Sequence, residues 1–98
     1  MQPDEHRSTA RVLAVLHFLA FESNNATLTE IAQHLNAPKS SLLPILRTMV
    51  EQKFLSYDEI SQRYAIGLNT YLVGAAYTNQ HGSYRHLIEE MQNIVDQC

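Results

Sequence analysis

Lysine, serine and arginine side chains fall close together in the stretch KSSLLPILRT, residues 39–48. A guanidinium such as that of Arg47 can donate two hydrogen bonds to guanine O6 and N7, and serine hydroxyls bond bases or phosphates. Ser40, Ser41 and Arg47 are therefore the candidates for reading bases or holding a nucleic-acid backbone. Lys39, at the entrance of the stretch, is expected to contact phosphate rather than a base. The plainer interpretation is a solvated surface arginine and serines that only cap a helix.

The apolar residues of this stretch repeat at helical spacing, which predicts a helix that begins at residues 39–41. Its core face is expected to hold Leu42, Ile45, Leu46, Met49 and Val50, and its opposite face Ser40, Pro44, Arg47, Thr48 and Glu51. A proline inside a helix loses one backbone bond and crowds the carbonyl four residues back, here that of Ser40, at a cost of about 3 kcal/mol. Because Pro44 falls just past the expected first turn, we predict a continuous helix whose first turn is loosened. Leu43, Pro44 and Thr48 complete the predicted contact surface of this helix.

Turn signals and apolar runs divide the rest of the chain into short elements. Ser8 is expected to cap a first helix that runs to about Glu22. This helix is apolar over most of its circumference, which predicts a core face and a second face against a partner. A short extended piece at 26–28 leads to a second helix that is capped by Thr29 and ends before Pro38.

Two short β patterns, 54–57 and 63–66, flank a polar linker and predict a hairpin. Further helices are expected at about 69–79 and 83–97, separated by a break at 80–82. The last helix carries an apolar stripe formed by Leu87, Met91, Ile94 and Val95. No other element is assigned to cover this stripe, so we expect the helix to be disordered or to pack against another copy. The chain looks like a part of something longer.

The order of these elements is helix, short strand, two helices joined by a tight turn, and hairpin. It predicts a mainly α fold with a small β wing, the winged helix-turn-helix, in which the third helix enters the major groove of DNA. Thr29 and the helix amides behind it suit a phosphate, with a plain capping role as the alternative. Arg63 in the wing could reach phosphate, unless Asp58 and Glu59 neutralise it.

Composition sets limits on these interpretations. The 98 residues are 45% hydrophobic and 17% charged, which favours a folded chain. The formal net charge of −3 does not by itself indicate a nucleic-acid binder. Residues 37–53 nevertheless carry three cations against Glu51 alone, a local balance of +2. DNA contact is therefore expected at a small basic face on an acidic body.

Patterns typical of catalysis, metal binding or secretion do not occur in the sequence. The single cysteine, Cys98, can form no internal disulfide, which fits a cytoplasmic setting. The five histidines lack metal-ligand spacing, and His17 is expected in the core or in an interface. The three glycines are isolated, so no phosphate loop is expected. The most apolar run, 12–21, is too short to span a membrane. We expect no enzyme, no metal and no cofactor.

Four stretches resemble the N-terminal part of IclR-type transcriptional regulators, over roughly residues 8–80. STARVLAVLHFLA resembles the family's opening Ser-x-x-Arg-x-Leu helix, and LTEIAQHLNAPKSSLLPILRTM resembles its Leu-Thr-Glu-Ile-Ala and Pro-Lys-Ser recognition segment. KFLSYD and YAIGLNTYLVG resemble its wing and its Tyr-x-Leu-Gly exit into a linker helix. Residues 83–98 are similar to the first helix of the family's effector-binding domain.

The resemblance implies a homodimer that binds an operator and regulates transcription. It also implies that a small-molecule effector acts only in a full-length protein with a C-terminal domain. Arg11 becomes a candidate backbone contact, with a surface ion pair as the alternative. The implied organisation is a tail at 1–7, a DNA-binding domain at 8–67, a linker helix and turn at 68–82, and the start of an effector-binding domain at 83–98.

Two positions depart from the family's pattern. The family usually has a polar or basic residue, often arginine, where this chain has Pro44, and the wing here carries the acidic pair Asp58 and Glu59. Pro44 and the acidic net charge motivate an alternative function, a winged-helix protein-interaction module that binds no DNA. For a dimer, we predict an interface formed by the first and the linker helices, because both carry more apolar surface than one core uses.

Overall fold

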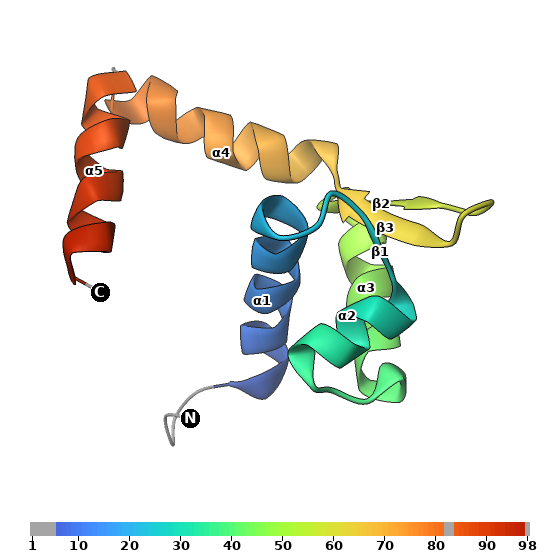
Figure 1. The fold of residues 1–98 in the computed structure, drawn as a ribbon. Coiled ribbons are helices and arrows are strands. Elements are labelled where there is room, and N and C mark those ends of the chain that lie inside the picture. The colour runs from blue at the N-terminus through green and yellow to red at the C-terminus, as the bar shows by residue number, and fades with distance from the viewer. Residues whose placement is uncertain (1–5, 82–83, 98) are drawn as a thin grey trace.

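The computed structural model describes residues 6–81 and 84–97 of the chain (Figure 1). In chain order the elements are α1 Arg7–Phe21, β1 Ala26–Thr27, α2 Leu28–Leu35, α3 Lys39–Glu51, β2 Leu55–Asp58, β3 Arg63–Ile66, α4 Leu68–His81 and α5 Tyr84–Gln97. This mainly α fold with a small sheet is the predicted winged helix-turn-helix followed by helices. Outside the described residues lie 1–5 of the predicted tail, Gly82 of the predicted break, Ser83 at the predicted start of the last helix, and Cys98.

The start of α1 differs from the predicted one. The backbone of His6 is extended, and His6 Nδ1 accepts a hydrogen bond from the Thr9 N–H at 3.3 Å. A cap needs an acceptor placed to reach an unpaired amide of the first turn, and His6 meets this requirement one residue before α1 begins. Ser8 already lies inside the helix, so its prediction as the cap is wrong.

The cap of α2 is Thr27 rather than Thr29. The Thr27 hydroxyl accepts from the Glu30 N–H at 3.2 Å, and the Glu30 carboxylate accepts from the Thr27 N–H at 2.9 Å. This reciprocal capping box requires an acidic side chain three residues after the cap, a spacing that Glu30 has from Thr27 and not from Thr29. The extended piece before α2 is accordingly shorter than predicted and ends at residue 27.

The core lies where α1, α2 and α3 meet the sheet. Its buried side chains are Val15, Leu19, Ala26, Ile31, Ala32, Leu42, Leu46, Met49, Leu55 and Tyr64. The predicted core face of α3 is confirmed, since three of its residues are buried and Ile45 and Val50 border them.

At the surface, the His34 ring stacks on Phe18 with centroids 4.1 Å apart, and His34 Nε2 lies 3.2 Å from a carboxylate oxygen of Glu22. These contacts join the C-terminal end of α1 to α2.

The sheet is antiparallel, with the strand order β1-β3-β2. The predicted hairpin is confirmed, although β2 begins and ends one residue later than expected. Because β3 is central and pairs with β1, the wing is joined directly to the strand that precedes α2. A Cβ atom at Gly67, after β3, would lie 2.5 Å from the Lys53 carbonyl oxygen and 2.8 Å from the backbone of Leu55. Only glycine therefore allows the chain to pass from the wing into α4 at this point.

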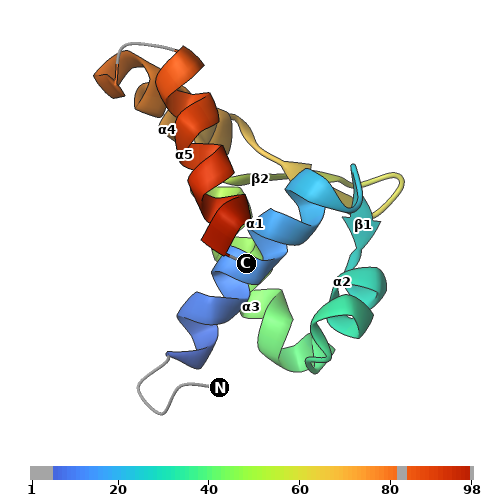
Figure 2. The ribbon, with the colours of Figure 1, turned by 60° about the vertical axis from the view of Figure 1, so that its left-hand side comes forward.

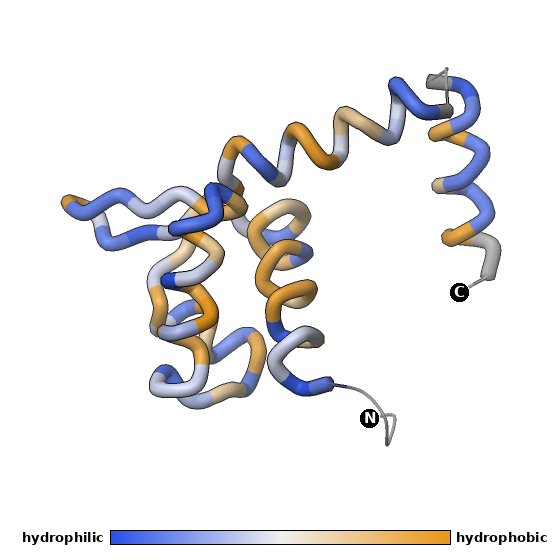
Figure 3. Tube along the Cα trace, turned by 180° about the vertical axis from the view of Figure 1, so that it is seen from behind, coloured by the Kyte–Doolittle hydropathy of each residue, from blue (hydrophilic) through white to orange (hydrophobic). Residues whose placement is uncertain are grey.

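α4 leads away from the wing, and α5 turns off from the far end of α4, which it contacts near the connection (Figures 1 and 2). α4 runs to His81, beyond the predicted end at residue 79. α5 is helical, so the first of the two expected outcomes, disorder, is wrong, and packing against another copy stays a prediction. Met91, Ile94 and Val95 of its apolar stripe are each more than half exposed. Apolar residues also recur along α1 and α4 (Figure 3).

Candidate nucleic-acid interface

The polar face of α3 is exposed beside the wing. Residues 36–38 form the turn between α2 and α3, and Asn36 adopts left-handed backbone angles with φ 52°. Asparagine tolerates this conformation, which ends α2 and turns the chain into α3. The exposed residues of the predicted α3 surface are Lys39, Ser40, Ser41, Pro44, Arg47 and Thr48, and Leu43 is half-buried.

The start of α3 explains why its two serines remain available. Pro38 occupies the cap position and provides no side-chain hydrogen bond, so the serines do not cap the helix. The Pro38 carbonyl accepts from the N–H groups of Ser41 and Leu42 at 3.1 and 3.2 Å. These two bonds close the first turn of α3. They show no sign of the loosening that was predicted for this turn. The prediction that α3 continues through Pro44 is confirmed.

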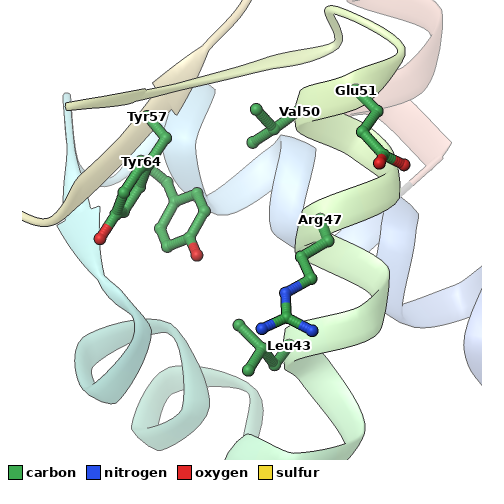
Figure 4. Close-up of a pocket in the computed structure, with 6 residues that line it drawn as sticks. All are labelled: Leu43, Arg47, Val50, Glu51, Tyr57 and Tyr64. Carbon is green, nitrogen blue, oxygen red and sulfur yellow. The ribbon is translucent and has the colours of Figure 1, made fainter. Parts of the chain in front are cut away.

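Arg47 is the cation at the centre of this face. Among the described residues it has neither an ion-pair nor a hydrogen-bond partner. Its side chain leaves α3 on the side that faces Tyr57 and Tyr64 of the wing, whereas the Glu51 side chain points to the other side of the helix (Figure 4). The guanidinium thus keeps its donors available for an external acceptor.

Thr48 is less available than its exposure suggests. Its hydroxyl donates to the Pro44 carbonyl, one turn earlier, at 3.1 Å. The single hydroxyl proton is therefore used within α3, and the oxygen of Thr48 is left to act as an acceptor.

Arg63 is already engaged by two partners. Its Nη1 donates to Glu30 Oε1 at 3.0 Å and to Asn25 Oδ1 at 3.2 Å. The neutralising carboxylate is thus Glu30 of α2, not Asp58 or Glu59 as the alternative interpretation proposed. Glu30 and Arg63 are 33 residues apart in sequence, and no local spacing indicates that they meet.

Hydrogen bonds hold two carboxylates of this region in the charged form. The Thr27 N–H, and less strongly the Arg63 guanidinium, keep the pKa of Glu30 below its ordinary value. The Ser61 hydroxyl, with the Ile60 N–H, likewise lowers the pKa of Asp58. Asp58 accepts these two bonds at 2.8 and 3.2 Å, which closes the wing turn.

Thr29 and Lys39 come together, although ten positions separate them. Both line an open hollow of about 580 Å³ between α2 and the start of α3. Arg11 lies in the second turn of α1 and is half-buried. His17 is exposed and its ring lies 4.9 Å from that of Phe21. Of its two expected places, the core is therefore wrong, and an interface stays a prediction.

Tyr57 and Tyr64 belong to the same surface, and no motif or spacing marks them in the sequence. They stand opposite each other on β2 and β3, with ring centroids 4.6 Å apart. Burial, and less strongly Tyr57, raise the pKa of Tyr64, while the Arg47 charge acts in the opposite sense. Arg47 and both tyrosines line one hollow between α3 and the wing.

Within residues 6–81 and 84–97, His, Cys, Asp and Glu side chains form no group of three that could hold a metal ion. No helix in the described part of the chain is both long enough and apolar enough to cross a membrane.

Comparison with known proteins gives consistent matches. Residues 8–59 match the family model of the IclR helix-turn-helix domain. The chain is 29% identical over 97 residues to the transcriptional repressor IclR of Escherichia coli, covering 92% of this chain and 35% of that protein. It is 32% identical over 75 residues to the glycerol operon regulatory protein of Streptomyces coelicolor, covering 76% and 30% of the two chains.

A solved structure is similar over the same region. The IclR transcriptional regulator from Alicyclobacillus acidocaldarius matches with a TM-score of 0.78 and 33% identity, over 92% of this chain and 36% of that one. The chain thus spans about a third of the length of the relatives that it matches.

Proposed function

The chain belongs to the IclR family of transcriptional regulators, and from this premise we propose that it binds double-stranded operator DNA sequence-specifically as the DNA-binding part of a homodimeric regulator. α3 enters the major groove, and the wing lies against the sugar-phosphate backbone. The observation that carries this proposal is the polar face of α3, where Arg47 has no partner among the described residues.

The contact surface has two kinds of member. Groups on α3 can reach base edges or the backbone, and groups around it can only hold the backbone. The proposed α3 contacts are Lys39, Ser40, Ser41, Leu43, Pro44, Arg47 and Thr48, and the proposed surrounding contacts are Thr29, Arg11 and Arg63. Arg63 is the member with the strongest competitor, because Glu30 already occupies its guanidinium.

A charge reversal on α3 tests DNA binding. Since phosphate contacts release counterions, wild-type affinity for duplex DNA should fall as salt is added. Arg47→Glu should weaken binding by at least about tenfold, because it replaces a donor by a repelled carboxylate. The measurement is fluorescence anisotropy on a duplex selected by the wild-type chain from a random-sequence pool, over a salt series.

Arg85→Glu is the matched control, since Arg85 lies on α5 and is 91% exposed. Affinity that does not respond to salt, or an Arg47→Glu variant that binds like the control, would favour the second candidate function. That candidate is a winged-helix protein-interaction module, which the net charge of −3 and Pro44 favour.

The proposed homodimer uses α1 and α4. Apart from its buried stripe, α1 exposes Leu13 by 63% and Phe21 by 76%, and α4 exposes Tyr71 by 67% and Leu72 by 51%. Exposed apolar side chains that recur on two helices are typical of a surface that another protein covers. A second copy of the chain is the proposed partner.

The proposal includes the division of the chain into a tail at 1–7, a DNA-binding domain at 8–67, a linker at 68–82 and the start of an effector-binding domain at 83–98. A small-molecule effector would act only in a longer protein that carries the remainder of that domain. No catalytic step, metal or cofactor is part of the proposal, and the expected location is the cytoplasm.

A further inference from the structure

A continuous groove runs between α3, the wing and the start of α2. One hollow of about 360 Å³ reaches from Arg47 to the wing, and a second of about 300 Å³ reaches from the wing to Thr29. Both are lined by Leu43, Tyr57 and Tyr64, so the two hollows adjoin. We call this feature the wing groove.

The walls of the wing groove combine a cation, hydroxyl groups and apolar surface. Arg47 stands on the α3 wall without a carboxylate partner among the described residues, and its side chain extends toward the tyrosines (Figure 4). Tyr57 on the opposite wall is 38% exposed. Leu43 and Val50 add apolar surface on the α3 side. Glu51 also borders the groove, but its side chain points away from the tyrosines (Figure 4).

We infer that the wing groove seats one sugar-phosphate strand of duplex DNA, with a phosphate held by the Arg47 guanidinium and the Tyr57 hydroxyl and a deoxyribose against Leu43 and Val50. The inference rests on the proposed function and makes it more specific. A strand that borders the major groove must pass between a helix inside that groove and a wing beside it. Arg47, a cation without a carboxylate partner in the described part of the chain, is complementary to the charge of such a strand.

This placement separates positioning from base reading on α3. Leu43 and Arg47, four residues apart, share the side of α3 that faces the wing. Pro44 and Thr48 instead line a different hollow, which they share with Val12 of α1. Arg47 is then a backbone contact that sets the register of α3 on the duplex, and the serines remain as candidates for base contact.

Two substitutions of Arg47 distinguish a phosphate contact from a base contact. Arg47→Gln should lower affinity about threefold to tenfold, equally for a duplex selected by the wild-type chain and for a scrambled duplex of the same composition, and should reduce the salt slope by about 1. Arg47→Lys should retain the slope, since lysine holds phosphate as a point charge but cannot reproduce bidentate bonding to guanine.

Tyr57→Phe tests the opposite wall. It keeps the ring that packs on Tyr64 and removes only the hydroxyl, so both duplexes should bind about twofold to tenfold more weakly with an unchanged salt slope. The matched control for Arg47→Gln is Arg85→Gln, which makes the same charge change on α5 and should alter neither affinity nor slope. Thermal melting of each variant verifies that it is folded.

The outcomes are distinct. A loss confined to the selected duplex, or an Arg47→Lys variant as weak as Arg47→Gln, would assign Arg47 to base reading and overturn the inference. If the wild-type chain binds DNA and both Arg47→Gln and Tyr57→Phe bind it equally well, the proposed DNA binding stands. The inference that a strand lies in the wing groove is then wrong. A wild-type chain that binds neither duplex would refute the proposed function itself.

Discussion

At the scale of single residues, Pro44 is the position where local rules and the observed helix disagree. Proline has no N–H, so the Ser40 carbonyl loses the bond it would otherwise receive inside α3. α3 nevertheless runs unbroken to Glu51, because its first turn is closed by the Pro38 carbonyl and the Thr48 hydroxyl adds a bond to the Pro44 carbonyl. The ring of Pro44 is exposed and lines a hollow together with Val12 and Ile45.

Replacing Pro44 should therefore stabilise the protein. Pro44→Ala restores the bond to the Ser40 carbonyl and should raise the free energy of unfolding by about 1–3 kcal/mol. Pro44→Arg should gain similar stability and also bind a scrambled duplex more tightly, because it adds a cation to the α3 face. Thermal melting and anisotropy measure the two effects. A lower melting temperature for both variants would mean that Pro44 stabilises the folded protein by more than the missing bond costs.

At the scale of elements, the contact between α2 and the wing depends on one carboxylate. Glu30 completes the capping box of α2 and also accepts from Arg63 of β3. Two contacts therefore join the wing to α2: the bond from Arg63 to Glu30, and the pairing of β3 with β1, the strand that precedes α2. Arg63 is thus positioned to orient the wing, whether or not it also reaches phosphate.

The lowered pKa of Glu30 makes this contact sensitive to acid. The stabilisation is fully present above the ordinary value of 4.5 and is lost as the pH falls through the lower value of the folded state. Wild type should therefore melt at a higher temperature than Glu30→Gln at neutral pH, and the difference should shrink below pH 4.5. Thermal melting across pH measures it, with Glu59→Gln in the wing turn as the matched control. A difference that persists undiminished in acid would contradict a role for the charged carboxylate.

At the scale of the whole molecule, the chain is less compact than a single domain of its length. Its radius of gyration is 15.0 Å, whereas a compact chain of 98 residues has a value of about 13 Å. α4 and α5 account for the difference, because they extend from the wing away from the three-helix core (Figures 1 and 2). This arrangement leaves apolar residues exposed on α1, α4 and α5, which favours a partner molecule.

The proposed dimer can be disrupted at its apolar surface. Leu13→Glu combined with Leu72→Glu should convert a dimer into a monomer at high micromolar concentration, because both side chains are more than half exposed and would face a second copy. Sedimentation velocity measures the change. Ile60→Glu makes the same change at a wing position that is 96% exposed and should leave the dimer intact. A wild-type chain that sediments as a monomer at this concentration would refute the proposed interface.

The sequence by itself determined the order of the elements and the two faces of α3. Helical periodicity depends on residues three and four apart, so Leu42, Leu46 and Met49 identify the core face without tertiary information. Caps were less predictable where two candidates lie two residues apart, as Thr27 and Thr29 do. The spacing from Thr27 to Glu30 could have resolved that choice, since a capping box is a local pattern.

Only the tertiary structure decided which distant side chains meet. Arg63 binds Glu30 across 33 residues, and Tyr57 and Tyr64 face Arg47 because β2, β3 and α3 pack on a shared core. Such contacts depend on how elements pack and not on sequence spacing, so a pattern with helical or strand period cannot reveal them. For this reason the exposed face of α3 was predictable, whereas the groove beside it was not.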